Sequence, residues 1–310
     1  MIKKFAIVTL LILLPSVYYF VFDGSLPKIS SYKLDLDKIR ALADAPNFEL
    51  PIEIRTEVFA KTPVPYFALR AGGGFQNTFM TRTVFQIMAP SGFYALETGM
   101  DLALAEEYNQ SENFQPEVWL GIQNVLSNSL AIMVTHEHPD HMGGIVRHRA
   151  PSELAEKLFL TMEQFAALDR FATEEGLPSA IRNYQPINLL EPMRVAPGIV
   201  IIPAKGHTPG SVIIYVKLQS DKEFLFIGDI AYTASNIRDG VDRARFARLL
   251  MHDPEDRDAV VNQLKTLHEI SKLEPSLYII PAHADKLIKH LIHEEVIFKG
   301  FILDNLLSFN

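Results

Sequence analysis

Cysteine is absent from the 310 residues of this chain, and positive charge is in the minority. The first absence excludes disulfides, zinc–thiolate sites and cysteine nucleophiles. The formal net charge of −8 at pH 7 argues against a nucleic-acid partner, because phosphate binding requires a basic surface. The sequence also has no fixed-period repeat and no low-complexity tract. With 48% hydrophobic residues, the chain has the composition of a globular protein with a sizeable core.

One long apolar run is present, FAIVTLLILLPSVYYFVF from Phe5 to Phe22, which is near the minimum length for crossing a bilayer. Two lysines precede it and Asp23 ends it, so the positive-inside tendency places the N-terminus in the cytoplasm. We therefore expect residues 1–24 to anchor the chain in a membrane, with the following domain outside the cytoplasm, in the periplasm if the cell is Gram-negative. Secretion after signal cleavage and a buried N-terminal helix are the alternatives.

The rest of the chain divides into a linker and one domain. Residues 25–56 are polar and contain an amphipathic helical pattern at 34–43, whereas residues 57–310 hold the expected domain. In that domain, residues 65–74 and 83–101 read as strands of a hairpin-like start, and residues 152–175 and 236–272 read as helical. Strands and helices mixed in this order predict a layered α/β fold with helices outside.

The stretch THEHPDHMGG, residues 135–144, contains three of the ten histidines. His136 and His138 are two residues apart in an extended segment, so both side chains point to the same side and can bind one cation. Asp140 and His141 point elsewhere and can bind a second cation. Apolar strands elsewhere end at His207, Asp229 and His283, and strand ends on one side of a sheet converge.

These residues predict a site for two metal ions. His207 could complete a three-histidine shell on the first ion, His283 could join Asp140 and His141 on the second, and Asp229 is left to bridge. Nitrogen and carboxylate ligands without sulfur suit two Zn²⁺ ions best, and Mn²⁺ or Fe could occupy the same shell.

The four motifs THEHPDH, GHTPGS, FIGD and PAH resemble the metal-binding motifs of the metallo-β-lactamase superfamily. The resemblance implies a four-layer αββα sandwich with a dinuclear centre at one edge, and a hydrolase whose metals lower the pKa of water to about 7. It implies that Asp140 orients the attacking hydroxide. The usual Asp-Thr-Gly motif is here Glu97-Thr98-Gly99, which puts the geometry of that loop in doubt.

Tyr232, three residues after Asp229, resembles a tyrosine of the N-acyl-homoserine-lactone lactonases that binds the substrate carbonyl. It could stabilise an oxyanion or simply pack under the loop. The primary hypothesis is a dinuclear zinc hydrolase that acts on a small-molecule lactone or ester. A phosphodiesterase or β-lactam hydrolase with the same metals is the second, and a non-catalytic metal-bound envelope module that binds a partner is the third.

Two further features leave alternatives open. The arginine-rich stretch RDGVDRARFARLL, residues 238–250, could receive an anionic substrate, but its interspersed acids favour an exposed helix face. The segment from Ser152 to Tyr184 could form an apolar lid over an acyl chain, although the spacing of its phenylalanines favours core positions.

Overall fold

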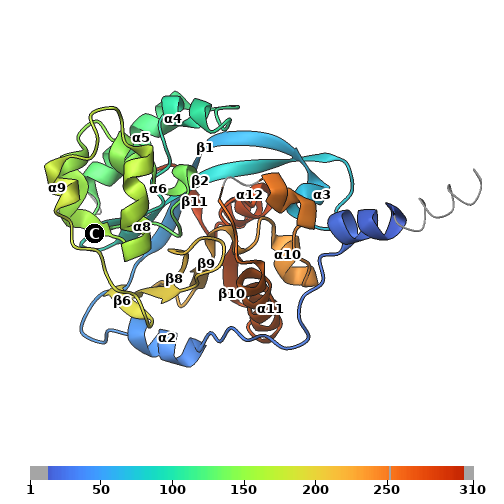
Figure 1. Cartoon of the computed structure of the whole chain (residues 1–310). Coiled ribbons are helices and arrows are strands. Elements are labelled where there is room, and N and C mark those ends of the chain that lie inside the picture. Colours follow the sequence, from blue (N-terminus) through green and yellow to red (C-terminus); the bar gives the residue numbers. More distant parts are fainter. Residues whose placement is uncertain (1–12, 251–252, 304–310) are drawn as a thin grey trace, which may run out of the picture.

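The computed structural model describes residues 13–250 and 253–303, which form two β-sheets packed face to face between helices (Figure 1). The six-stranded sheet has the order β11-β1-β2-β3-β4-β5. It consists of β1 (Glu53–Pro65), β2 (Asn77–Ala89), β3 (Gly92–Leu96), β4 (Ile132–Met133), β5 (Leu158–Phe159) and β11 (Phe298–Lys299). The five-stranded sheet has the order β10-β9-β8-β7-β6. It consists of β6 (Met193–Ala196), β7 (Ile199–Pro203), β8 (Val212–Lys217), β9 (Glu223–Phe226) and β10 (Leu277–Ile280).

Helices surround both sheets. The α-helices are α2 (Leu36–Ala43), α3 (Tyr66–Leu69), α4 (Leu102–Glu107), α5 (Pro116–Asn128), α6 (Pro139–Met142), α7 (Gly144–Arg147), α8 (Met162–Ala167), α9 (Ser179–Arg182), α10 (Ala234–Asp239), α11 (Arg257–Leu273) and α12 (Asp285–His293). The 3₁₀ and π helices are η1 (Tyr18–Phe22), η2 (Pro151–Lys157), η3 (Leu168–Phe171), η4 (Gly228–Ile230) and η5 (Arg245–Leu250).

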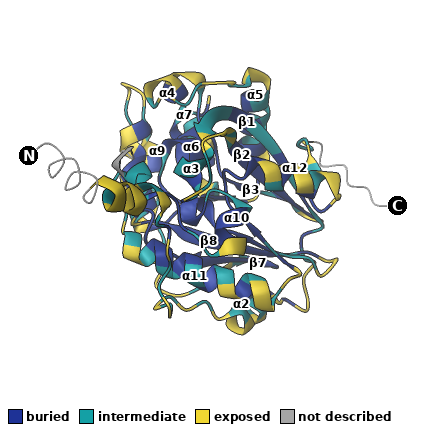
Figure 2. Cartoon of the chain, turned by 90° about the vertical axis from the view of Figure 1, so that its right-hand side faces the viewer, coloured by how far each residue is buried: buried dark blue, intermediate teal, exposed yellow. Residues whose placement is uncertain are grey.

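Three buried apolar layers hold the four structural layers together. On β8, Ile214 faces the layer between the sheets, whereas its neighbours Ile213 and Tyr215 face the layer under α2 and α11. On β2, Phe85 faces the layer between the sheets and Val84 faces the third layer, under α4 and α5. This alternation with period two is what a sheet covered on both faces requires. Figure 2 shows the sheets buried and the outer helix faces exposed, as the predicted αββα sandwich requires.

The start of the domain differs from the expectation. The strand predicted at 65–74 is instead the short helix α3 followed by a glycine-rich turn, because Phe67 N–H donates to Gly74 O and closes the connection between β1 and β2. Gly72 and Gly74 both have positive φ there, which favours glycine. The domain boundary predicted at residue 57 falls inside β1, whose polar, proline-containing sequence gives only a weak strand signal.

Other segments follow the sequence pattern more closely. The amphipathic stretch forms α2, and the strands at 83–101 form the end of β2 and all of β3. The helical region predicted at 236–272 is interrupted, because the described residues between α10 and α11, 240–250 and 253–256, are irregular apart from η5. We call this connection the α10–α11 segment. In the 152–175 region, Phe171 is buried in the core and Phe165 packs against it, so these phenylalanines are core rather than lid residues.

The N-terminal apolar run is only partly described, since residues 1–12 lie outside the described residues. Residues 13–22 are helical and end in η1, and most of their apolar side chains are exposed (Figure 2). Within the described part of the chain, no helix is both long and apolar enough to cross a membrane. The predicted anchor therefore stays a prediction.

Candidate metal centre

The predicted ligands all follow the carboxyl ends of strands at one edge of the sandwich. The 135–141 loop follows β4, His207 follows β7, Asp229 follows β9 in η4, and His283 follows β10. All seven ligand-type side chains come together there in two neighbouring groups. One group is His136, His138, His207 and Asp229, and the other is Asp140, His141 and His283. Within each group, the potential ligand atoms lie within 4.8 Å of one another.

The first group points three ring nitrogens at one position. His138 Nδ1 lies 3.0 Å from His136 Nε2 and 3.1 Å from His207 Nε2. Ligand atoms about 2.0–2.1 Å from one tetrahedral zinc ion lie about 3.3 Å apart, so this spacing fits a single ion. Burial holds the pKa values of His136 and His207 well below the ordinary histidine value. Both rings are therefore neutral, which is the form that binds a metal.

Asp229 lies between the two groups. Its carboxylate oxygens are each 3.1 Å from His283 Nε2, and Oδ2 is 3.5 Å from His207 Nε2. Burial favours the neutral acid, but His283, which also hydrogen-bonds the carboxylate, and His141 outweigh it and hold the pKa of Asp229 well below its ordinary value. The carboxylate is thus ionised at the point where it can contact ions in both groups.

The second group contains the remaining ligand-type atoms. Asp140 Oδ2 lies 3.8 Å from His141 Nε2 and 3.7 Å from His283 Nε2. His141 Nε2 and Asp229 Oδ1 are buried and have no hydrogen-bond partner among the described residues. Buried polar atoms without partners are rare in proteins. A cation bound in each group would satisfy these two atoms. The residues present therefore fit two metal ions such as Zn²⁺.

The side of this centre nearest the six-stranded sheet is fixed by Glu97, at the end of β3. Its buried carboxylate accepts hydrogen bonds from Thr135 Oγ1 at 2.5 Å and Thr135 N–H at 3.2 Å, and it lies 3.1 Å from His141 Nδ1. Burial disfavours the charged imidazolium of His141, but Glu97 and Asp140 outweigh it and raise its pKa to about 10. Glu97 therefore lies within hydrogen-bond distance of His141 Nδ1 and orients the His141 ring.

Glu97 also has an unusual backbone conformation, with φ of +67°, which non-glycine residues rarely adopt. The rest of this side comes from β2. His283 Nδ1 donates to Thr81 O at 2.6 Å, and Arg82 Nε lies 3.5 Å from Asp140 Oδ2. Arg82 in turn donates from Nε to Gln110 and from Nη1 to Thr62. Each ligand of the second group thus has an outer partner on β2 or just after β3.

The opposite side is supported by the α10–α11 segment. His207 Nδ1 lies 2.9 Å from the buried carboxylate of Glu255, and His138 Nε2 lies 3.5 Å from Asp253. Outer carboxylates of this kind fix the tautomer and orientation of a metal-binding imidazole. Glu255 also pairs with Arg243 and Arg248, and Asp253 with Arg170.

Close backbone packing joins the motif loops. Glu137, in the middle of the histidine motif, accepts hydrogen bonds from Thr208 Oγ1 and from Gly210 N–H at 2.8 Å. A Cβ on Gly228 would lie 2.7 Å from Thr135 Oγ1, and Gly228 has φ of +52°. A glycine is therefore required beside Asp229, because no side chain fits between η4 and the histidine loop.

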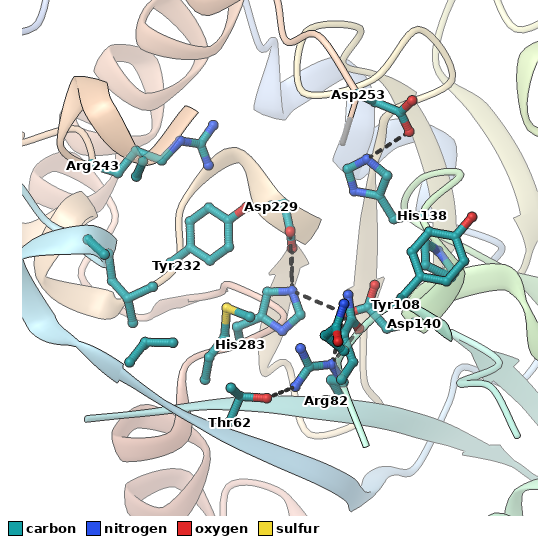
Figure 3. A pocket seen from close by; sticks show the side chains of 18 residues that line it. Thr62, Arg82, Tyr108, His138, Asp140, Asp229, Tyr232, Arg243, Asp253 and His283 are labelled. Carbon is teal, nitrogen blue, oxygen red and sulfur yellow. Dashed lines mark hydrogen bonds and ion pairs between the residues drawn. The ribbon is translucent and has the colours of Figure 1, made fainter. Parts of the chain in front are cut away.

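A pocket of about 320 Å³ opens onto the centre (Figure 3). One wall is apolar and comes from β1, α3, β2 and η5, with Val64, Ala68, Leu69, Met80 and Ala247. The other wall contains His138, Asp140, Asp229 and His283. Tyr232 also lines the pocket, and its ring stacks on His283 with centroids 5.5 Å apart. Burial and the neighbouring Asp229 carboxylate raise the pKa of Tyr232 far above its ordinary value, so its phenol remains a hydrogen-bond donor.

Several residues at this site were not predicted from the sequence, namely Arg82, Asp253 and Glu255. For the stretch that contains Arg243, the sequence favours an exposed helix face over a site for an anionic substrate, but Arg243 is 4% exposed and lines the pocket. The only sequence signal for it was the density of arginines in residues 238–250. Asp253 and Glu255 gave no signal, because acids between helical segments are common on protein surfaces.

Comparison with known proteins gives independent evidence. A family model described as the beta-lactamase superfamily domain matches residues 111–280, more than half of the chain. The N-acyl homoserine lactonase of Bacillus thuringiensis is 28% identical over 146 residues. That match spans 47% of this chain and 52% of the relative, so the chain matches about half the length of this curated relative.

Solved structures agree in fold. A quorum-quenching N-acyl homoserine lactone lactonase superposes with a TM-score of 0.57 at 17% identity, covering 78% of this chain and 96% of that one. A dizinc quorum-quenching lactonase in complex with a homoserine product gives a TM-score of 0.51 at 12% identity, covering 74% and 86%. The αββα layers, the convergent histidine and aspartate motifs and the family match lead to one conclusion: this chain is a member of the metallo-β-lactamase superfamily.

Proposed function

We propose that this chain is a metal-dependent hydrolase with a dinuclear zinc centre, and that it cleaves the carbonyl–oxygen bond of a lactone or related ester. The observation that carries the proposal is the convergence of seven ligand-type side chains, with inward-facing nitrogens and unsatisfied buried atoms, at the floor of one pocket. A module that only binds a partner has no need of this arrangement beside an open cavity.

The candidate ligands would be shared between the two metal ions as follows. His136, His138 and His207 would hold one zinc ion, Asp140, His141 and His283 the other, and Asp229 would contact both. When bound, zinc supplies Lewis acidity that polarises a carbonyl and makes water a competent nucleophile near neutral pH. Metal analysis of the purified chain tests this assignment, with two zinc ions per chain as the expected result.

The remaining residues supply positioning and proton control. The carboxylate of Asp140 is held by Arg82 and faces His283, so it orients the attacking water. The phenol of Tyr232 stays protonated next to the centre, so it donates a hydrogen bond to the oxygen that gains charge as the carbonyl is attacked. The apolar wall excludes water from the other side of the substrate.

A lactone or ester is favoured over other substrates by two facts. The relatives in Bacillus thuringiensis are named N-acyl homoserine lactonases, and the pocket combines an apolar wall with a phenol donor beside the centre. The experiment is proton release by the full zinc-loaded chain with a panel of acyl-homoserine and simple lactones at neutral pH. We expect turnover that a chelator abolishes and zinc restores.

Two variants make this test specific. Asp229→Ala should lower turnover by about 10³-fold or more, because it removes the group shared by both ligand sets. His293→Ala is the matched control, since this histidine is 83% exposed on α12 and should retain wild-type turnover. Equal turnover in wild type and Asp229→Ala would refute the proposal.

Tyr232→Phe tests the role of the phenol. Loss of one oxyanion donor should lower kcat by about 10²-fold, with a smaller change in KM. Tyr278→Phe is its control, because Tyr278 stacks on Phe224 away from the pocket. If Tyr232→Phe keeps the wild-type kcat, the phenol packs under the loop without taking part in the reaction.

We also propose that the N-terminal segment anchors the domain outside the cytoplasm. The exposed apolar side chains of residues 13–22 support this, because such a surface avoids water. A reporter that is active only outside the cytoplasm, fused after Asn310, should give signal. N-terminal sequencing of the mature chain distinguishes an uncleaved anchor from a cleaved signal peptide. A reporter fusion that gives no signal would overturn the proposed orientation.

A further inference from the structure

We propose that Arg243 binds an anionic group of the substrate, so that the preferred lactone or ester carries a carboxylate or phosphate. This inference rests on the proposed hydrolase function and specifies its substrate class. Arg243 belongs to the α10–α11 segment, is 4% exposed, and lines the same pocket as Asp229, Tyr232 and His283.

The position of Arg243 is fixed by stacking. Its guanidinium carbon lies 4.8 Å from the centroid of the Tyr232 ring, and Tyr232 in turn stacks on His283. Figure 3 shows Arg243, Tyr232 and His283 in this succession, with Arg82 beyond them. A group bound to Arg243 would therefore lie one aromatic ring away from the metal centre, within the span of a small substrate.

The charges around Arg243 do not balance. Arg245 pairs with Asp23, Arg257 with Asp242, and Arg170 with Asp253, so each of these arginines has a carboxylate of its own. Arg243 and Arg248 instead share the single carboxylate of Glu255, which also faces His207. Among the described residues, these five arginines pair with four carboxylates, which leaves one guanidinium charge in excess around the α10–α11 segment.

The hydrogen-bond donors of Arg243 are also incompletely used. Its Nε and Nη1 are buried and have no acceptor among the described residues. Burial and the charge of Arg243 lower the pKa of Arg248 to about 10, which is consistent with two cations held together. A planar guanidinium matches a carboxylate or phosphate through paired hydrogen bonds, so an anion would satisfy both the charge and the donors.

The second buried arginine in the pocket has a different role. Arg82 donates to Gln110 and Thr62 and lies beside Asp140, so protein groups already occupy its donors. Arg243 thus has unused donors whereas Arg82 does not. This difference assigns substrate recognition to Arg243 and the positioning of Asp140 to Arg82.

The test compares three substrates of the full zinc-loaded chain. They are 4-nitrophenyl acetate, which is neutral, 4-nitrophenyl hydrogen succinate, which carries a carboxylate, and 4-nitrophenyl 4-(phosphonooxy)butanoate, which carries a phosphate remote from its ester. We expect wild type to favour an anionic substrate over the neutral one. In Arg243→Gln, the anionic-to-neutral ratio of kcat/KM should fall by about tenfold or more, because charge-assisted hydrogen bonds are lost. The substrate whose ratio falls identifies carboxylate or phosphate.

The controls separate a specific role from a structural one. Arg245→Gln removes an arginine of the same segment that is paired with Asp23 outside the pocket, so its ratio should equal that of wild type. Arg243→Lys keeps the charge without the planar donor pair and should retain part of the preference. An unchanged ratio in Arg243→Gln, with hydrolysis intact, would overturn the inference and leave Arg243 as a structural residue.

A binding measurement covers the case in which none of the substrates is hydrolysed, which would count against the proposed function. Calorimetric titration compares monoethyl succinate, an anion, with neutral diethyl succinate. Tighter binding of the anion to wild type, reduced about tenfold in Arg243→Gln, supports the anion site without any turnover. Equal binding of the anion to the two proteins overturns it. Melting temperatures of the variants confirm that each is folded.

Discussion

The two sides of the metal centre are built differently. On the sheet side, Glu97, Thr81 and Arg82 contact the ligands His141, His283 and Asp140 from β2 and the end of β3. On the loop side, Asp253 and Glu255 contact His138 and His207 from the irregular α10–α11 segment. Strands within a sheet hold side chains more precisely than a loop does.

This difference suggests a division of roles between the two sides in metal binding and substrate choice. On the sheet side, Glu97, Thr81 and Arg82 position the ligands, and Arg82, which also lines the pocket, has its donors occupied by protein groups. The loop side supports two ligands and also brings Arg243 and Ala247 into the pocket, so it faces the substrate as well. Changes on the sheet side should therefore affect metal binding most, whereas changes on the loop side should affect substrate choice as much as metal binding.

Gly228→Ala should have the largest effect, because it disturbs both sides at once. A Cβ at this position would press on Thr135, which links Glu97 to the histidine loop. We expect a loss of stability of about 2–4 kcal/mol from overpacking and strain together, with weaker zinc binding in both groups. Chemical denaturation and zinc titration measure these effects.

The matched control for this substitution is Gly176→Ala. Gly176 has φ of +70°, but no atom of the described part of the chain lies within 4 Å of the Cβ it would gain. It should lose only about 1 kcal/mol, from backbone strain. Equal losses in the two variants would mean that contact with Thr135 plays no part.

Glu97→Gln breaks the sheet side alone. It removes the buried charge that faces His141 while keeping a similar shape, so zinc affinity should fall by about 10–100-fold, mostly at the second group. Glu97→Asp restores the residue usual for the motif and keeps the charge, so it should lose less. A competition titration with a chromogenic chelator measures both. If Glu97→Gln binds zinc with wild-type affinity, then the sheet side does not hold its ligands through Glu97, and the comparison fails.

Glu255→Gln breaks the loop side. Zinc affinity should fall by about tenfold, because only His207 loses an outer partner. The same change leaves Arg243 and Arg248 without a carboxylate, so the α10–α11 segment should loosen and become sensitive to protease while the sheets stay folded. Glu163→Gln, which removes a surface partner of Lys205, is the control. A uniform loss of stability would show that the two sides form one cooperative unit.

The sequence predicted that the candidate ligands converge at one edge of the sheets, because they follow apolar strands in short, distinctive motifs. His136, His207 and Asp229 could be placed near one another by the rule that strand ends on one side converge. Glu97 was recognised by its place in a motif, although its contact with His141 could not be foreseen. The reason is that this contact depends on a backbone with positive φ.

The loop side could not be predicted in the same way. Asp253 and Glu255 lie in a segment whose charge pattern resembles an exposed helix, and only the tertiary fold turns it toward the histidines. The strand β1 was missed for a similar reason, since its pairing with β2 rather than its own composition stabilises it. Long-range pairing of polar segments leaves little trace in local sequence.

Asp253→Asn should have the smallest effect and gives the finest test of the comparison. Asp253 is 27% exposed and lies 3.5 Å from His138, so solvent screens the interaction. Zinc affinity should change by no more than about threefold, and stability by no more than about 1 kcal/mol, as for a surface ion pair. Asp221→Asn, an exposed carboxylate remote from the pocket, sets the baseline. A tenfold loss of zinc affinity in Asp253→Asn would mean that the loop holds its ligands as firmly as the sheet does, and the distinction between the two sides would then reduce to substrate recognition alone.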